Sequence, residues 1–136
     1  MTTGSTIAAL KAAAKGLLYQ SETDEPFTAF KWRAEDVGGN LSRKKVLGLG
    51  GHGAKEHVEE RTADEFFAPL VRHEDWHGDE EKAAAEGYEK LAEAVGSLLA
   101  NPRVYKVGDG PEKTIYVVGK AKSGDWAGVK TTAIET

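Results

Sequence analysis

The sequence predicts an α+β protein in which helices cover an antiparallel sheet. Three observations support this class: an amphipathic helical pattern at residues 79–100, an alternating strand pattern at residues 27–33, and three β-rich segments after Pro102. A helix, a strand, further helices and a final strand meander are typical of α+β proteins. The chain contains no internal repeat and no low-complexity linker, so we expect residues 1–136 to form one domain.

The chain begins with a predicted amphipathic helix from about Ser5. Lys11 and Lys15 lie off its apolar face, and Gly16 weakens the helix without ending it. The apolar face consists of Ile7, Leu10, Ala14, Leu17 and Leu18.

An acidic loop and a strand follow this helix. Pro26 keeps the loop at residues 20–26 extended, and residues 27–33 then alternate as a strand does. The alternation places on one face of the strand Thr28, Phe30 and Trp32. The carboxylates of the loop are a catalytic pair, an acidic recognition surface or a solvated turn, and catalysis has the least support because no substrate pocket is visible. These carboxylates belong to Glu22, Asp24 and Glu25.

The middle of the chain is harder to assign. Residues 37–53 are rich in glycine and predict irregular structure, with at most a short strand near Val46 and Leu47. Residues 54–61 are polar and do not predict a packed helix. Residues 62–65 form a capping box that begins a helix, whose length Pro69 limits.

The strongest pattern is the helix at residues 79–100. Its apolar stripe consists of Ala84, Tyr88, Leu91, Val95 and Leu98. Asn101 and Pro102 end the helix. Residues 104–108, 114–121 and 126–134 then read as a three-stranded meander, with turns at residues 109–111 and 123–125.

Composition limits the possible functions. The chain has no cysteine, which excludes disulfides and thiol nucleophiles, and its formal net charge of −4 disfavours direct nucleic-acid binding. Arg43, Lys44 and Lys45 are the one basic cluster, and such a cluster in a loop is more often a solvated turn than a phosphate site. We see no signal peptide and no membrane span, so we expect a cytoplasmic protein.

Residues 73–77 match the zinc-hydrolase pattern H-E-x-x-H, with His73 and His77 as ligands and Glu74 as the general base. That pattern needs a helix through both histidines, whereas these residues immediately precede the start of the long helix. No third histidine stands at the usual spacing. Two exposed histidines in a loop are therefore the simpler interpretation.

The run at residues 48–53 contains four glycines but lacks the strand, following helix and Lys-Ser/Thr pair of a phosphate loop, so a flexible surface loop is favoured. Trp32 alternates with Phe30 as a core residue does. Trp76 lies in a charged segment and is the better interface candidate.

The final strand runs to the last residues of the chain. Glu135 and Thr136 offer a carboxylate, a hydroxyl and the terminal carboxylate, all hard oxygen ligands suited to Mg²⁺ or to a cationic pocket, unless the chain simply stops there.

Motifs along the whole chain resemble the nuclease A inhibitor family, small proteins that inhibit sugar-nonspecific endonucleases cleaving DNA and RNA. The shared motifs are Gly16-Leu17-Leu18-Tyr19, Ser21-Glu22, Pro26-Phe27, Phe30-Lys31-Trp32, Gly51-His52-Gly53, Asp75-Trp76, Asp79-Glu80-Glu81, Asn101-Pro102, Val104-Tyr105, Tyr116-Val117-Val118-Gly119, Ala127-Gly128-Val129 and Glu135-Thr136. Residues 37–61 match less well apart from the Gly-His-Gly motif.

The resemblance implies an α/β/α sandwich like that of plant pathogenesis-related proteins. It also implies a non-enzymatic inhibitor that needs no cofactor and blocks a nuclease active site one-to-one. By this likeness Thr136 reaches the catalytic Mg²⁺ of the nuclease, Glu22 engages its cationic catalytic residues, and Asp75 and Trp76 are contact residues. We add Asp24 and Glu135 to this partner-binding set and expect a monomer when free. The alternatives are a zinc-dependent hydrolase using His73, Glu74 and His77 or a binding module for another basic protein.

Overall fold

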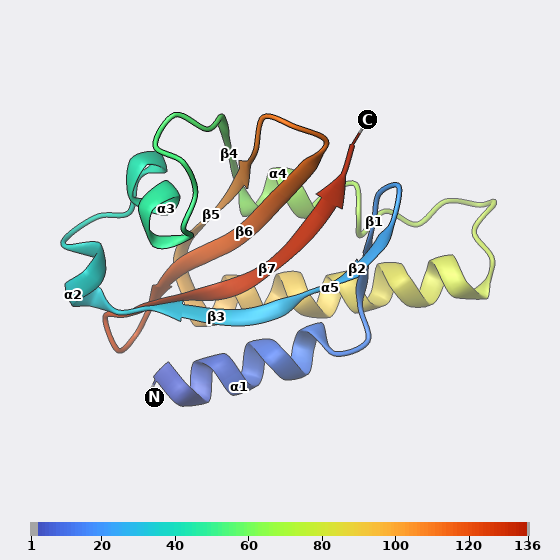
Figure 1. Ribbon diagram of the computed structural model, residues 1–136. Coiled ribbons are helices and arrows are strands. Elements are labelled where there is room, and N and C mark those ends of the chain that lie inside the picture. The colour runs from blue at the N-terminus through green and yellow to red at the C-terminus, as the bar shows by residue number, and fades with distance from the viewer. Residues whose placement is uncertain (1–2, 136) are drawn as a thin grey trace.

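The computed structural model describes residues 3–135, which form a five-stranded antiparallel sheet between two unequal helical layers (Figure 1). Three helices cover one face of the sheet: α1 (Thr3–Ala14), α4 (Ala63–Phe67) and α5 (Asp79–Leu98). On the other face lies α3 (Arg43–Leu49), next to the single turn of α2 (Ala34–Val37). The predicted class, helices packed on an antiparallel sheet, is confirmed.

The strand order is β3-β7-β6-β5-β4. The bounds are Thr28–Trp32 for β3, Val58–Thr62 for β4, Leu99–Val107 for β5, Glu112–Ala121 for β6 and Trp126–Ile134 for β7. Consecutive strands β5, β6 and β7 form the predicted meander, and β3 is the strand expected at residues 27–33. The first long strand of the chain therefore pairs with the last one.

Each face of the sheet has its own hydrophobic cluster because side chains alternate along the strands. The larger cluster packs under α1, α4 and α5 and includes Leu10, Leu91 and Val117. The smaller cluster packs under α3 and includes Val46 and Tyr116. Strand β6 is buried on both faces, which explains its continuous apolar run.

The first helix ends earlier than the sequence pattern predicts. Helix α1 stops at Ala14, and Gly16 has a φ of 79°, a left-handed conformation that favours glycine and turns the chain away from the helix. Leu17 and Leu18, expected on the apolar face of this helix, lie beyond it. The prediction that Gly16 only weakens the helix is therefore wrong.

The predicted extended acidic loop is a small hairpin. Strand β1 (Leu18–Gln20) pairs antiparallel with β2 (Asp24–Pro26). At its turn the Ser21 N–H donates to the Thr23 carbonyl oxygen at 3.0 Å. The tip of the hairpin carries Glu22, one of the predicted partner-binding residues.

Residues 37–61 are more regular than the sequence predicts. The Ser42 hydroxyl accepts a hydrogen bond from the Lys45 N–H at 3.3 Å and so begins α3. Val46 and Leu47 are buried, but on this helix and not on a strand. The following polar segment leads into edge strand β4, which pairs with β5. The glycines around this short helix hide its start and end from pattern analysis.

The junction between α5 and β5 is sharper than expected. The helix ends at Leu98 and the strand begins at Leu99, so Asn101 and Pro102 lie inside β5. Asn101 has a φ of 46°, and the pairing with β6 shifts between Ala100 and Arg103. This bulge accommodates the proline, which cannot donate to the ladder.

Within residues 3–135 the longest helix, α5, carries too many charged side chains to cross a bilayer, and none of the others has the length.

Candidate functional site

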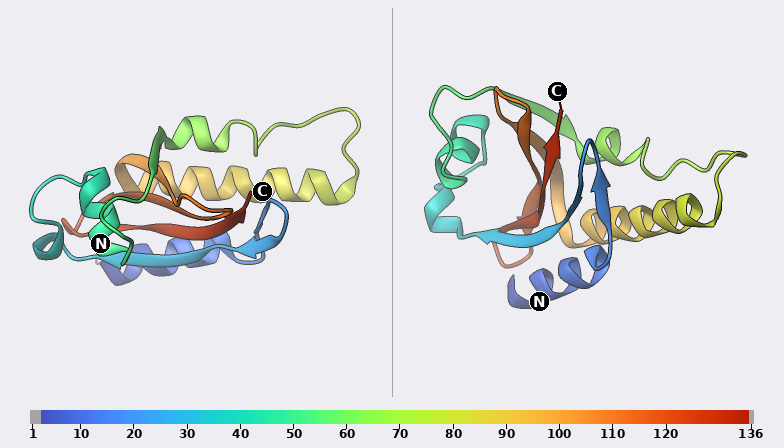
Figure 2. Two further views of the ribbon diagram at one scale, coloured as in Figure 1. Left: turned by 45° about the horizontal axis from the view of Figure 1, so that its top comes forward. Right: turned by 45° about the vertical axis from the view of Figure 1, so that its right-hand side comes forward.

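The end of β7 lies between the tip of the β1–β2 hairpin and the turn that joins β5 to β6 (Figures 1 and 2). We call this region the terminal edge; it consists of residues 21–23, 109–111 and 134–135. Glu22 and Glu135 come from opposite ends of the sequence, and the Glu22 backbone bonds Ile134, the residue before Glu135. Asp24, in β2, is exposed beside it.

Hydrogen bonds fix the hairpin against β7. The Ile134 N–H donates to the Ser21 hydroxyl at 2.9 Å, and the Glu22 N–H donates to the Ile134 carbonyl oxygen at 3.2 Å. Further along the strand, the buried Thr131 hydroxyl donates to the Pro26 carbonyl oxygen at 3.0 Å. Strand β3 begins at Thr28, which pairs with Lys130 of β7. From Thr131 to Ile134, the hairpin takes the place of β3 as the neighbour of β7.

An ion pair lies behind the terminal edge. The Lys106 ammonium is 2.5 Å from a Glu135 carboxylate oxygen, and the Lys106 side chain is 22% exposed. Next to them, burial raises the pKa of Tyr19, while the charge of Lys106 lowers it and that of Glu135 raises it. The Glu135 carboxylate is thus already engaged within the protein.

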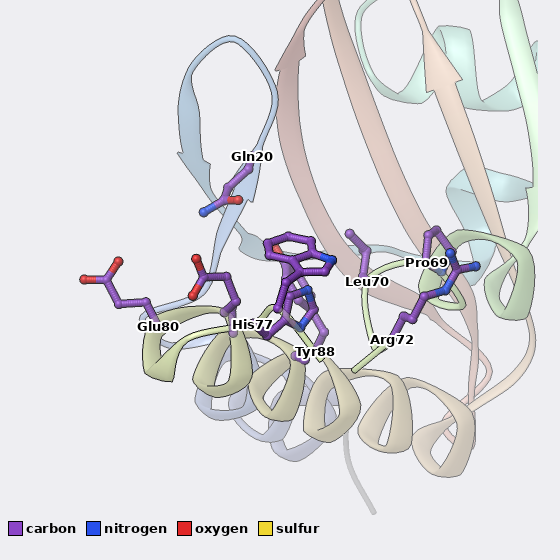
Figure 3. A pocket seen from close by; sticks show the side chains of 11 residues that line it. Gln20, Pro69, Leu70, Arg72, His77, Glu80 and Tyr88 are labelled. Atoms are coloured by element: carbon purple, nitrogen blue, oxygen red, sulfur yellow. The ribbon is translucent and has the colours of Figure 1, made fainter. Parts of the chain in front are cut away.

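A pocket of about 330 Å³ adjoins the hairpin (Figure 3). Gln20 reaches it from β1, Glu80 and Tyr88 from α5, and Leu70 and Arg72 from the segment that precedes α5. Gln20 directly precedes Ser21, so the pocket and the terminal edge are neighbours.

Trp76 belongs to the lining of this pocket, and 74% of its surface is exposed. Its ring stands perpendicular to that of His77, with the ring centroids 4.3 Å apart. Asp75 precedes it in the same turn and is exposed. An exposed indole beside a partly apolar pocket is a typical interface feature.

Tyr88 joins the hairpin to α5. Its hydroxyl donates to the Leu18 carbonyl oxygen, and burial raises its pKa to about 12, with smaller contributions from Tyr19 and Asp24. The phenol is therefore protonated at neutral pH and able to donate. This bond fixes β1 over the floor of the pocket.

The H-E-x-x-H segment does not form a metal site of the zinc-hydrolase kind. Its residues lie in the loop before α5, so no helix aligns the two imidazoles. His73 pairs with Glu89 at 2.6 Å, and the His77 Nδ1 accepts from the Glu74 N–H at 3.2 Å. Within residues 3–135, no three His, Asp or Glu side chains are grouped to hold a metal ion. The geometry that the zinc alternative needs is absent from this segment.

The glycine run and the basic cluster have structural roles. The run ends α3 instead of beginning a helix, as a phosphate loop would require, and His52 within it bonds the Tyr116 hydroxyl at 2.7 Å. Arg43, expected in a loop, opens α3 and pairs with Glu60 at 3.4 Å. The Lys45 ammonium donates to the Gly38 carbonyl oxygen at 3.0 Å.

Trp32, expected in the core, packs against the smaller cluster together with Trp126. Its ring centroid lies 4.8 Å from that of Phe30. Of the three tryptophans, Trp76 has the exposure expected of an interface residue.

The structure thus brings Glu22, Asp24 and Glu135 to one edge, with Trp76 in the lining of the adjoining pocket and Asp75 next to it in the chain. Thr136, predicted as the metal-contacting residue, lies outside the described residues. Sequence reasoning missed Ser21 and Lys106. One signal was available for Lys106, since it occupies a core-facing position of β5, two residues after buried Val104.

Comparison with known proteins supports one family. A search of curated proteins finds no match. Residues 4–136, nearly the whole chain, match the family described as nuclease A inhibitor-like protein. The fold predicted for that family agrees with the helices and antiparallel sheet found here. The chain therefore belongs to the nuclease A inhibitor-like protein family.

Proposed function

We propose that this protein is a non-enzymatic inhibitor of a Mg²⁺-dependent, sugar-nonspecific endonuclease and that it blocks the active site one-to-one. The observation that carries the proposal is the meeting of Glu22 with the end of β7 at the terminal edge, in a chain of this family. We further propose that residues 1–136 act as one domain and that the free protein is a monomer.

The chemistry of such an enzyme supports this assignment. A nuclease binds a phosphodiester with a metal ion and cationic side chains, so protein oxygens can occupy the positions of phosphate oxygens. In this proposal Glu22 pairs with the cationic catalytic groups. The end of β7 delivers Thr136, whose hydroxyl approaches the Mg²⁺ of the enzyme.

A second contact region supplies affinity beside the active site. Trp76 offers a rigid apolar surface, and the exposed Asp75 and Asp24 add negative charge. Because a nuclease surface is built to attract a polyanion, these carboxylates speed association with it.

The direct test is titration of the purified protein into a Mg²⁺-dependent nonspecific endonuclease while cleavage of both DNA and RNA is followed. We expect both activities to disappear at a one-to-one ratio. If every such endonuclease tested keeps its activity in the presence of the protein, the proposal is excluded and a binding module for another basic protein is favoured.

Two variants then test the assigned residues. Glu22→Ala should raise the inhibition constant by about 30-fold or more, because it leaves partner cations unpaired. Glu93→Ala, which removes the same charge from the exposed side of α5, is the matched control and should leave the inhibition constant unchanged.

Deletion of Thr136 should weaken inhibition while the thermal midpoint stays nearly constant. If the chain without Thr136 inhibits as well as the full chain, Thr136 does not contact the Mg²⁺.

A further inference from the structure

The end of β7 is held on both of its edges. On one side, the Ser21 hydroxyl accepts from the Ile134 N–H at 2.9 Å. The same hydroxyl donates to the Thr23 carbonyl oxygen at 3.2 Å, which orients its lone pair toward β7. On the other side, the Glu135 N–H donates to the Pro111 carbonyl oxygen at 2.8 Å. Both backbone N–H groups at this strand end are therefore satisfied internally.

The Glu135 side chain is held as well. Its carboxylate meets the Lys106 ammonium at 2.5 Å, and Lys106 is the less exposed of the two side chains, at 22% against 41%. A largely covered ammonium keeps its carboxylate partner because separating them would leave a charge poorly solvated. Lys106 comes from β5, two strands away from β7, so it ties the strand end to the rigid centre of the sheet.

From this geometry we propose that Ser21 and Lys106 are positioning residues that hold the end of β7 ready for the nuclease, and that Glu135 acts through Lys106 rather than by touching the partner. This inference rests on the proposed function, and it changes the expected role of Glu135 from contact to alignment.

Preorganisation explains why such a clamp would matter. A free chain end loses conformational entropy when a partner immobilises it, and that loss weakens binding. Because Ile134 and Glu135 are already fixed by their hydrogen bonds, ordering these two residues adds nothing to that loss on binding. The ammonium of Lys106 also reduces the repulsion between Glu135 and Glu22 at the same edge.

The first test needs no nuclease. Amide hydrogen exchange is measured by NMR in the free chain and in the variants Ser21→Ala and Lys106→Met. We expect exchange at Ile134 in the first variant, and at Glu135 in the second, to accelerate about five- to tenfold, as loss of one such interaction implies. The amides of Val117 and Val129 in the middle of the sheet should keep their rates.

Matched controls come from the far end of the sheet and from α5. Lys120→Met makes the same chemical change on β6, and Ser97→Ala removes an exposed hydroxyl from α5. Neither should alter exchange at Ile134 or Glu135. Unchanged exchange at these two amides in the clamp variants, or an equal acceleration across the whole sheet, would overturn the clamp.

The second test measures inhibition of a Mg²⁺-dependent nonspecific endonuclease. Ser21→Ala and Lys106→Met should each raise the inhibition constant about tenfold, and Lys106→Arg should restore most of the loss because it keeps the ion pair. In a chain that lacks Thr136, the same two changes should have no further effect, since a positioning residue acts only through the residue that it positions.

The outcomes separate the two proposals. If the two variants weaken inhibition by the same factor with and without Thr136, Ser21 and Lys106 act independently of the chain end, and the inference is wrong. If the unmodified chain inhibits no such enzyme, the proposed function fails and the positioning role fails with it. The exchange data would then still show whether the strand end is clamped.

Discussion

Trp76 exposes most of its indole although apolar side chains lie close to it. Leu70 and Tyr88 line the same pocket, but the indole, in the loop before α5, stays outside the core. Exposure of so large an apolar surface costs free energy in water, and contact with a partner recovers it. The position of Trp76 is the main reason to propose that the pocket is part of an interface.

Replacement of Trp76 tests this interpretation. Trp76→Ala should raise the inhibition constant by about 30-fold, the usual cost of removing an interface hot spot. Trp76→Phe should show a smaller loss because it keeps an aromatic face. The thermal midpoint should not fall in either variant, since an exposed side chain contributes little packing. Equal inhibition by all three chains in a titration would show that the indole lies outside the interface.

The residues of the site differ in how far sequence could identify them. Glu22, Asp75 and Trp76 stand in motifs that resemble a family, so they could be named at once. Ser21 stands in the same motif as Glu22, but its role and that of Lys106 could not be named, because they depend on partners 113 and 29 positions away along the chain. Such contacts are set by the register of the sheet, which no local pattern reveals.

Among the elements, helix α4 shows how a short segment is stabilised by its cap. The Thr62 hydroxyl accepts from the Glu65 N–H at 3.1 Å, and the Glu65 carboxylate accepts from the Thr62 N–H at 3.1 Å. This reciprocal pair is the predicted capping box. It fixes the direction in which Phe66 and Phe67 enter the larger cluster.

Loss of the cap should therefore be measurable. Thr62→Ala should lower the free energy of unfolding by about 1 kcal/mol, because the Glu65 N–H loses its acceptor. Thr62→Ser keeps the hydroxyl and serves as the control, which should retain most of that stability. Denaturant unfolding of the three chains makes the comparison. A serine variant as unstable as the alanine variant would show that the methyl group of Thr62, and not its hydroxyl, stabilises this region.

Elements with a long, regular pattern were predictable, and short ones next to glycine were not. In helix α5 and in the meander the apolar pattern repeats often enough to be recognised in the sequence. Helix α1 was predicted too long because Leu17 and Leu18 continue its spacing by chance, whereas Gly16 decides the end through its positive φ. Helix α3 was missed because it has only seven residues, of which only Val46 and Leu47 are buried, and because glycines lie in its last turn and directly after it.

All four tyrosines of the protein are more weakly acidic than a free phenol. Burial is the largest cause of the raised pKa of Tyr19, Tyr88, Tyr105 and Tyr116. The unfolded chain, with ordinary phenols, therefore loses these protons at a lower pH than the folded one. Above the unfolded pKa of about 10, each rise in pH favours unfolding.

Tyr88 makes this effect testable, because its pKa reaches about 12. The stabilisation linked to its proton is complete below pH 10 and disappears as the pH rises toward about 12. Tyr88→Phe should be less stable at neutral pH, since it lacks the bond to the Leu18 carbonyl oxygen, but should lose stability less steeply between these two pH values. Parallel curves of unfolding free energy against pH would contradict the assignment.

The pairing of β3 with β7 also has a consequence for the synthesis of the protein. Because these strands are about 100 positions apart, α1, β3 and the hairpin leave the ribosome long before their partner strand exists. Strand β3 exposes Phe30 and Trp32 during that interval. Helix α5 and strands β5 and β6 can assemble first, because their contacts are local. The nascent chain thus completes its terminal edge only after β7 has been made, so an unfinished chain lacks the surface that we propose for binding a nuclease.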